Sequence, residues 1–290
     1  MASVLSLKVS SDFALRPAVN TYGYYRLAPN VWDDEAGVLV RPLHDAGGGI
    51  VVTRTTQPRG GRKLTIRCDR TLNAADRAAV KRQVTRMLRL DEDLSAWRRL
   101  HRPAAKVHFG RLFRSPMLFE DIIKTITSCN ISWGGTIAMN QRLVEHFGEG
   151  GFPTARQLAA VKPAVLQKRC RVGYRADRMV KLARDVVEGR LDMAWFESPD
   201  RTTDELFDAL RHIHGVGPYA ASNILQHLGH YDRLPVDSEL IRHLKDSRGL
   251  EGTLAEITRR AHALYDPFAP YQFLAYWFEL WTGYRQRGVL

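Results

Sequence analysis

With 290 residues, 44% of them hydrophobic, the chain is globular and long enough for one large domain or two smaller ones. Its 43 Lys and Arg against 31 Asp and Glu give a net charge of +12, which is typical of a polyanion binder, although an arginine-rich composition or an acidic partner explains the same excess. No apolar run reaches the roughly 18 residues of a membrane helix, and the opening residues do not resemble a signal peptide, so we expect no membrane partner and an intracellular protein.

The first part of the chain predicts an antiparallel sheet with one long helix. Short β-branched runs separated by turn signals predict strands, and short turns between them favour antiparallel pairing. The strands are expected near residues 7–9, 37–41, 50–54 and 63–67. Asn73 is expected to cap an amphipathic helix that runs to Leu90, and residues 95–100 continue in helix.

From about residue 105 onward the pattern is helical. Apolar spacing, capping boxes, prolines and glycine stops mark successive helices. They are expected at 118–129 and 133–147, from 155, 163 and 175, at 203–212 and 218–228, from 238 and 254, and at 271–284. The expected fold class is therefore α+β, with an N-terminal antiparallel sheet domain over 1–104 and a mostly helical domain over 105–290.

Gly215-Val216-Gly217 separates two of these helices as a tight hairpin over about 203–229. Two glycines in three positions favour positive φ angles and stop the first helix, and Pro218 suits the first turn of the second. Such a hairpin presents helix N-terminal N–H groups to an anion, which in a basic protein suggests a nucleic-acid phosphate. An ordinary αα-hairpin explains the glycines equally well.

Asp237 follows the hairpin after a short link and is expected at the N-cap of the next helix. A lone N-cap aspartate is usually structural. The apolar neighbours Leu234, Pro235 and Val236 would, however, hold this carboxylate in a partly dry site.

Together, Gly215-Val216-Gly217 and Pro235-Val236-Asp237 resemble the signature of the helix-hairpin-helix (HhH-GPD) DNA glycosylase superfamily. The branches that the chain most resembles are the 3-methyladenine DNA glycosylase II and 8-oxoguanine glycosylase types, and the resemblance is clearest over residues 118–284. It implies an enzyme of base excision repair that flips a damaged base out of double-stranded DNA and hydrolyses its N-glycosidic bond. Asp237 would be the catalytic residue, because the oxocarbenium-like transition state needs a nearby anion.

The resemblance also implies which residues contact DNA. Hairpin binding is assigned to Gly215, Val216, Gly217, Tyr219 and Ala220. Counting back from Arg142-Leu143 places Asn130 where a side chain fills the gap left by the flipped base, although Asn130 is equally well explained as a turn residue between two helices. A further run, Gly173-Tyr174-Arg175-Ala176, is similar to one at this point in the superfamily and suits either packing or phosphate contact.

Tyr219 is the main departure from the bifunctional members, which carry a lysine at this position that forms a Schiff base and goes on to cut the strand. The amine is missing here, so a monofunctional glycosylase that leaves an abasic site is expected. An aromatic pocket would favour cationic alkylated purines such as 3-methyladenine. The candidates for this base pocket are Trp133, Tyr219, Asn223, Phe273 and Trp277, although the aromatic helix 271–284 is more simply explained as buried core.

The three cysteines, Cys68, Cys129 and Cys170, form neither a disulfide framework nor a zinc site, and no cysteine follows Cys170 to hold the iron–sulfur cluster of some branches. No cofactor is expected, except that the resemblance implies a monovalent cation, Na⁺ or K⁺, at the hairpin backbone between His212 and Gly217. A monomer is expected, in the cytoplasm or nucleoid of a bacterium or in the nucleus of a eukaryote. Two other functions stay open: a glycosylase for oxidised or deaminated bases (8-oxoguanine, hypoxanthine or uracil), and a non-catalytic DNA-binding protein.

Overall fold

The structure, a computed structural model, describes residues 2–287 and divides the chain into two compact units. The first comprises Met1–Glu92 and Arg111–Glu197, and the second comprises Asp93–Gly110 and Ser198–Leu290. The sequence-based domains, 1–104 and 105–290, divide the chain differently and stay a prediction. Each unit is described by itself below.

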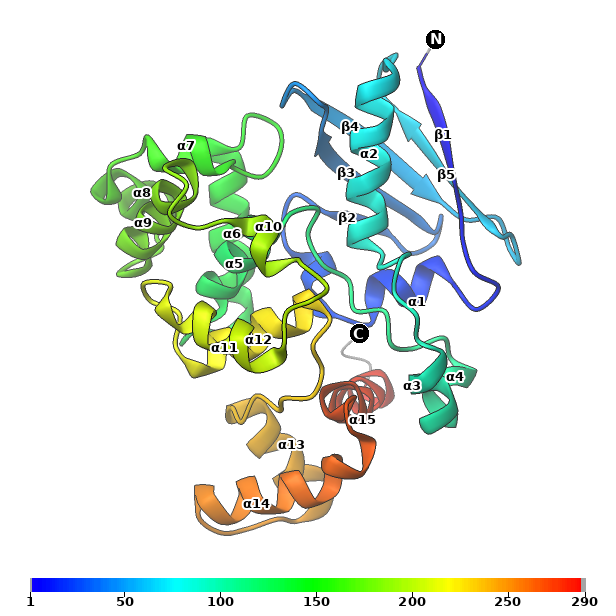
Figure 1. Cartoon of the computed structure of the whole chain (residues 1–290), viewed down its shortest axis with the longest axis vertical. Coiled ribbons are helices and arrows are strands. Elements are labelled where there is room, and N and C mark those ends of the chain that lie inside the picture. Colours follow the sequence, from blue (N-terminus) through cyan, green and yellow to red (C-terminus); the bar gives the residue numbers. More distant parts are fainter. Residues whose placement is uncertain (1, 288–290) are drawn as a thin grey trace. The chain divides into compact units, whose positions relative to one another are not determined.

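The first unit begins with a five-stranded antiparallel sheet in the order β1-β5-β4-β3-β2. The strands are β1 (Val4–Lys8), β2 (Val31–Asp33), β3 (Val38–His44), β4 (Ile50–Thr56) and β5 (Lys63–Cys68). Alternate residues of β3 and β4 are buried, as expected for a sheet with one covered face. The helix α2 (Ala74–Met87) crosses the sheet (Figure 1) and turns Val80, Val84 and Met87 into the core. The predicted sheet and the Asn73 cap are confirmed, and the helix ends at Met87 rather than Leu90.

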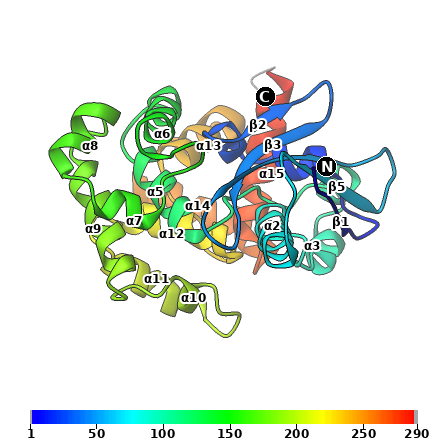
Figure 2. The same cartoon turned by 90° about the horizontal axis from the view of Figure 1, so that it is seen from above.

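Short helical segments complete the N-terminal part of the first unit, and a helical cluster forms the rest of it. The N-terminal segments are α1 (Leu15–Asn20) and the 3₁₀ helix η1 (Gly23–Arg26). The cluster contains α5 (Leu118–Ser128), α6 (Trp133–Phe147), α7 (Ala155–Ala159), α8 (Pro163–Cys170), α9 (Arg175–Val187) and α10 (Met193–Phe196). Figures 1 and 2 both show α6 to α9 gathered together. A buried ion cluster lies in the N-terminal part of α5, where the Glu120 carboxylate binds Arg41 at 2.6 Å and Lys124 at 2.7 Å.

The second unit is almost wholly helical. Its elements are α3 (Ser95–Leu100), α4 (Arg102–Lys106), α11 (Thr203–His212), α12 (Pro218–Leu228), α13 (Ser238–Arg248), α14 (Leu254–Tyr265), η2 (Asp266–Phe268) and α15 (Gln272–Gln286). Aromatic contacts join its two parts: the His101 and Phe278 rings lie 4.8 Å apart, and the Phe109 and Trp281 rings lie 5.3 Å apart. Within residues 2–287, every helix is too short or too polar to cross a bilayer.

Candidate DNA-binding hairpin and active-site aspartate

The glycine hairpin has the predicted form. Thr202 and Glu205 make a complete capping box at the start of α11. After α11, the Val216 N–H donates to the Ile213 carbonyl at 3.0 Å, and the 4% exposed Val216 side chain anchors the turn in the core. Gly215 has a φ of +85°, which explains the need for glycine.

Gly217 differs from the expectation of positive φ, because it has a φ of −84° and acts as the N-cap of α12. A Cβ at this position would meet nothing within 4 Å. Its missing side chain therefore leaves open space in front of the α12 N-terminus, where the first N–H groups of a helix lack partners in the helix itself. An anion from another molecule can approach closely here.

The link between α12 and α13 is fastened to α11. The Thr203 hydroxyl donates to Asp232 at 2.8 Å, and the Arg233 guanidinium binds Asp204 at 2.5 Å while lying 4.1 Å from the centre of the Phe207 ring. The Tyr231 carbonyl accepts a 2.8 Å hydrogen bond from the backbone N–H of Phe273 on α15. These contacts fix the chain that leads from the hairpin to Asp237.

Asp237 caps α13, as predicted, and its Oδ1 accepts a 2.7 Å hydrogen bond from the Leu240 N–H. The residue is half-buried beside the buried Leu234 and Pro235. Burial raises the pKa of the Asp237 carboxyl above its ordinary value, although the Leu240 hydrogen bond opposes this shift. The predicted environment, a carboxylate in a partly dry site, is confirmed.

The candidate pocket residues of the second unit have different surroundings. Tyr219 is 37% exposed near the start of α12, whereas the Asn223 side chain turns back and donates to the Tyr219 carbonyl at 3.0 Å. Phe273 is only 2% exposed and lies 5.9 Å from the partly exposed Trp277 ring, stacked at 16°. Phe273 therefore acts as a support for Trp277.

Asn130 lies in the first unit, in the turn between α5 and α6. It is exposed and has a φ of +51°, a conformation that asparagine tolerates better than most residues. The Arg175 guanidinium donates to the carbonyls of Cys129 and Asn130, so the first turn of α9 holds this backbone in place.

Tyr174 stands beside Asn130, with 3.4 Å between its hydroxyl and Asn130 Nδ2. It is 49% exposed, and the guanidinium groups of Arg175 and Arg178 each lie 4.6 Å from its ring centre. Neither Tyr174 nor Arg175 was predicted individually as a site residue, although packing or phosphate contact was expected for the run that contains them. The signal that could have found them was the Gly173-Tyr174-Arg175-Ala176 run.

Trp133 begins α6 and is 36% exposed. Its ring lies against the backbone of η1, because a Cβ added at Gly23 would come within 3.1 Å of it. Ile131, in the same turn as Asn130, is 46% exposed. The structure thus brings Trp133 and Tyr174 together with the Asn130 turn in the first unit, and it brings the hairpin together with Asp237 in the second.

No group of three or more His, Cys, Asp or Glu side chains within residues 2–287 is arranged to hold a metal ion. The cysteines are free, and burial raises the pKa of the Cys170 thiol to about 12. The hairpin does offer backbone carbonyl oxygens, including that of Ile213, which keeps a second lone pair beyond its bond to Val216. Oxygen ligands of this kind suit a hard cation.

Solved structures match this fold over nearly the whole chain. MBOgg1 in complex with a low-affinity DNA ligand is 21% identical, with a TM-score of 0.73 over 99% of both chains. The 3-methyladenine DNA glycosylase from Archaeoglobus fulgidus is 18% identical, with a TM-score of 0.71 over 96% of this chain and 98% of its own. The 8-oxoguanine glycosylase/lyase from Clostridium acetobutylicum in its apo form is 16% identical, with a TM-score of 0.70 over 97% of each chain.

No protein-family model matches the sequence, and the search of curated proteins found no match. The structural matches nevertheless span both the sheet and the helical parts. Their coverage, and the glycine hairpin that leads to an aspartate at a helix N-terminus, show that the chain has the fold of the helix-hairpin-helix DNA glycosylase superfamily.

Proposed function

We propose that the chain is a monofunctional DNA glycosylase of base excision repair, which hydrolyses the N-glycosidic bond of a damaged base in duplex DNA and leaves an abasic site. The observation that carries this proposal is Asp237: a half-buried carboxylate, with a pKa raised by burial, at the end of the link that follows the anion-binding hairpin. A partly buried carboxylate would not help a protein whose only role is to bind phosphates. This argues against a non-catalytic DNA-binding protein.

The hairpin and Asp237 have separate roles in this mechanism. The open space at Gly217 and the N–H groups of α12 receive a phosphate. Asp237 lies near C1′ of the flipped nucleotide, where its negative charge stabilises the oxocarbenium-like transition state and orients a water. The water oxygen bonds to C1′ as the glycosidic electron pair leaves with the base, and the proton of the water passes to solvent.

Solvent-exposed residues of the first unit are proposed to fill the gap that the flipped base leaves in the duplex. Asn130 stands on a rigid left-handed turn held by Arg175, and the exposed Tyr174 ring is beside it. A polar side chain and an aromatic plane at one protruding turn suit insertion into a base stack. We assign Asn130 the gap-filling role and Tyr174 a stacking role next to it.

Hydrolysis without strand cleavage follows from Tyr219, which occupies the position of the Schiff-base lysine. Lys124, on α5 of the other unit, is fully buried and paired with Glu120, so it cannot replace the missing amine. An alkylated purine is the favoured substrate, because a cationic base leaves as a neutral molecule and is attracted to aromatic faces such as Tyr219 and Trp277.

The second candidate is an oxidised base. It is favoured by the combination of Asn130, Tyr174 and Arg175 in a chain whose fold matches an 8-oxoguanine glycosylase/lyase. In either case we propose a monomer that acts on the chromosome inside the cell, with no iron–sulfur cluster and no cofactor beyond a Na⁺ or K⁺ ion at the hairpin carbonyls.

The test is incubation with duplexes that each carry one alkylated, oxidised or deaminated base, followed by alkali. We expect alkali-dependent cleavage, strongest on the 3-methyladenine or another alkylated-purine duplex. Strongest cleavage on the 8-oxoguanine duplex would select the second candidate. No cleavage of any duplex would overturn the enzymatic proposal.

A further inference from the structure

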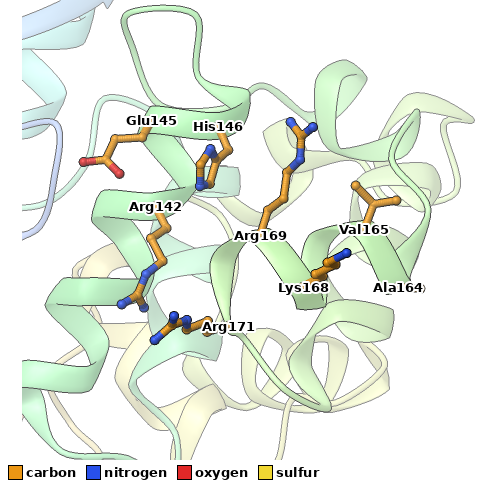
Figure 3. A pocket seen from close by; sticks show the side chains of 8 residues that line it. All are labelled: Arg142, Glu145, His146, Ala164, Val165, Lys168, Arg169 and Arg171. Atoms are coloured by element: carbon orange, nitrogen blue, oxygen red, sulfur yellow. The ribbon is translucent and has the colours of Figure 1, made fainter.

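The first unit, which does not contain the hairpin, has a basic surface of its own. A hollow of about 750 Å³ is formed by α6, α8 and the residue that ends α8. Five of its side chains are basic or imidazole groups and only one is acidic. They are Arg142, His146, Lys168, Arg169 and Arg171, with Glu145 as the acid. Figure 3 shows Arg142, Glu145 and His146 on one side and the side chains of α8 on the other, with Arg171 below Arg142 in this view.

Within the described residues, the cations of this hollow have no acidic partner, unlike several other arginines of the first unit. Arg41, Arg86 and Arg190 each bind a carboxylate. Within residues 2–287, by contrast, Arg142, Lys168, Arg169 and Arg171 take part in no ion pair. Glu145 accepts a 2.8 Å hydrogen bond from the Gln141 side chain. Because Glu145 is the single acid beside four Lys and Arg side chains, the hollow has an excess of positive charge. Like charges that share one hollow repel one another, and an anion relieves this repulsion.

Arg171 connects the hollow to the Asn130 turn. It is the C-cap of α8 in the left-handed conformation, with a φ of +54°, and Tyr174 follows only a short turn later along the chain. On the other wall, Arg142 lies about 14 Å along α6 from Trp133, at a rise of about 1.5 Å per residue. Arg142 is therefore separated from Trp133 by the length of about four base-pair steps of about 3.4 Å each, which is a short reach along a duplex that meets the Asn130 turn.

We infer that this hollow, defined by Arg142, Lys168, Arg169 and Arg171, binds the phosphate backbone of the duplex that flanks the lesion on one side. The inference rests on the proposed function, because it takes the Asn130 turn as the point of contact with the damaged base pair. Arginine suits phosphate oxygens through two parallel N–H donors. Among the described residues that line the hollow there is no Phe, Tyr or Trp, so a free nucleotide would find at most the His146 ring to stack on.

The inference is tested by removing three charges and measuring salt dependence. The variant Arg142→Gln, Arg169→Gln, Arg171→Gln is compared with wild type by fluorescence anisotropy, using a duplex with a central tetrahydrofuran abasic analogue at several salt concentrations. The slope of log K against log salt is negative, and each lost phosphate contact reduces its magnitude by about 0.9, so the slope of the triple variant should be smaller in magnitude by about 2 to 3. Thermal unfolding of the variant checks that it is folded.

A matched control removes three charges elsewhere on the same unit. Arg59, Arg62 and Lys63 are exposed at the β4–β5 turn, and their change to Gln alters net charge equally. We expect this control to keep a slope within about one contact of wild type. Equal slopes for both triple variants would overturn the inference, because general electrostatics would then explain the loss.

The flank is tested with two further duplexes, each shortened to about four base pairs on one side of the analogue. Wild type should lose affinity with one shortened flank, and the Arg142, Arg169 and Arg171 variant should be insensitive to shortening of that same flank. If both proteins respond alike to each shortened flank, the hollow does not contact DNA. The inference would also be overturned if inorganic polyphosphate or an acidic peptide bound at the hollow while the triple variant kept the wild-type salt dependence of DNA binding.

Failure of the inference is distinguishable from failure of the proposed function. If wild type neither excises a damaged base nor prefers the abasic analogue to undamaged duplex, the glycosylase proposal fails and the inference fails with it. If wild type does both and the two triple variants show the same salt dependence of DNA binding, only the inference about the hollow is wrong.

Discussion

Asp237 Oδ1 accepts a 2.7 Å hydrogen bond from the backbone N–H of Leu240, so the same carboxylate that is proposed to act at C1′ also begins α13. The helix N-terminus orients the carboxylate, while burial holds its pKa above the ordinary value. The two roles of Asp237 can be separated by substitution, since asparagine is as good an N-cap as aspartate but carries no charge.

Asp237→Asn should strongly slow excision while keeping the fold. Loss of the charge that faces the oxocarbenium should lower the single-turnover rate by about 100- to 1000-fold or more. Binding to the abasic-analogue duplex should change little, because the hairpin is untouched. Asp237→Ala should lose the cap as well, at a cost of about 1 kcal/mol in unfolding free energy. Full excision activity in the Asn variant would refute the assigned mechanism.

The pH dependence of excision should reflect the raised pKa of Asp237. The reaction needs the carboxylate, so the rate should fall as pH drops through a pKa that lies above about 3.9, the ordinary aspartate value. Single-turnover rates between about pH 4 and 8, on one duplex, measure this limb. An acid limb at or below the ordinary value would show that the carboxyl is solvated in the working enzyme.

The contribution of Asp237 to the free energy of unfolding should change with pH in the opposite direction to the excision rate. Because the folded-state pKa of Asp237 is raised, its contribution to stability is present in full at acid pH and is lost as pH rises through that pKa. Asp237→Asn should therefore gain stability relative to wild type between about pH 4 and pH 7. Urea denaturation at both pH values measures the difference. A relative stability that does not change with pH would contradict the burial argument.

Tyr219→Lys should create strand-cleavage activity. Tyr219 is exposed near the start of α12, and a lysine there places an amine at the position that forms a Schiff base in bifunctional enzymes. The Nζ atom would attack C1′ as the base leaves, and borohydride would reduce the imine to a stable protein–DNA complex. Wild type and Tyr219→Phe should give no trapped complex. A trapped complex with wild type would show that another amine acts and would end the monofunctional assignment.

Local signals were sufficient to predict the hairpin and the Asp237 cap, because capping boxes, glycine and proline act within one or two turns of chain. Contacts between distant residues were not predictable in this way. The strand β2 exists because Val31–Asp33 pairs with β3, not because three residues have a strong pattern. Likewise, Asn130 and Tyr174 are far apart in sequence, so only the structure reveals that an exposed aromatic ring stands beside the predicted gap-filling residue.

Glu120→Gln should destabilise the first unit strongly. Glu120 is 2% exposed and lies between Arg41 and Lys124, so its neutralisation leaves two buried cations facing each other. A loss of about 3–5 kcal/mol in unfolding free energy is expected. The control is Glu197→Gln, whose carboxylate pairs with Arg86 but is 35% exposed, for which about 0–1 kcal/mol is expected. Equal losses in urea denaturation would contradict this ranking.

Asn130→Gly should impair excision only when the duplex must be opened. Glycine accepts the φ of +51° that Asn130 adopts, so this variant removes the side chain without straining the turn. Excision from a fully paired duplex should fall about 10- to 100-fold, because the gap left by the flipped base is no longer filled. Excision from a mismatched bubble should fall far less, since unpairing there costs little. Asn130→Ala is the comparison for backbone strain, with about 1 kcal/mol of lost stability. Equal losses on the paired and bubble substrates would show that Asn130 acts on the chemical step, and unchanged rates on both would show that it is only a turn residue.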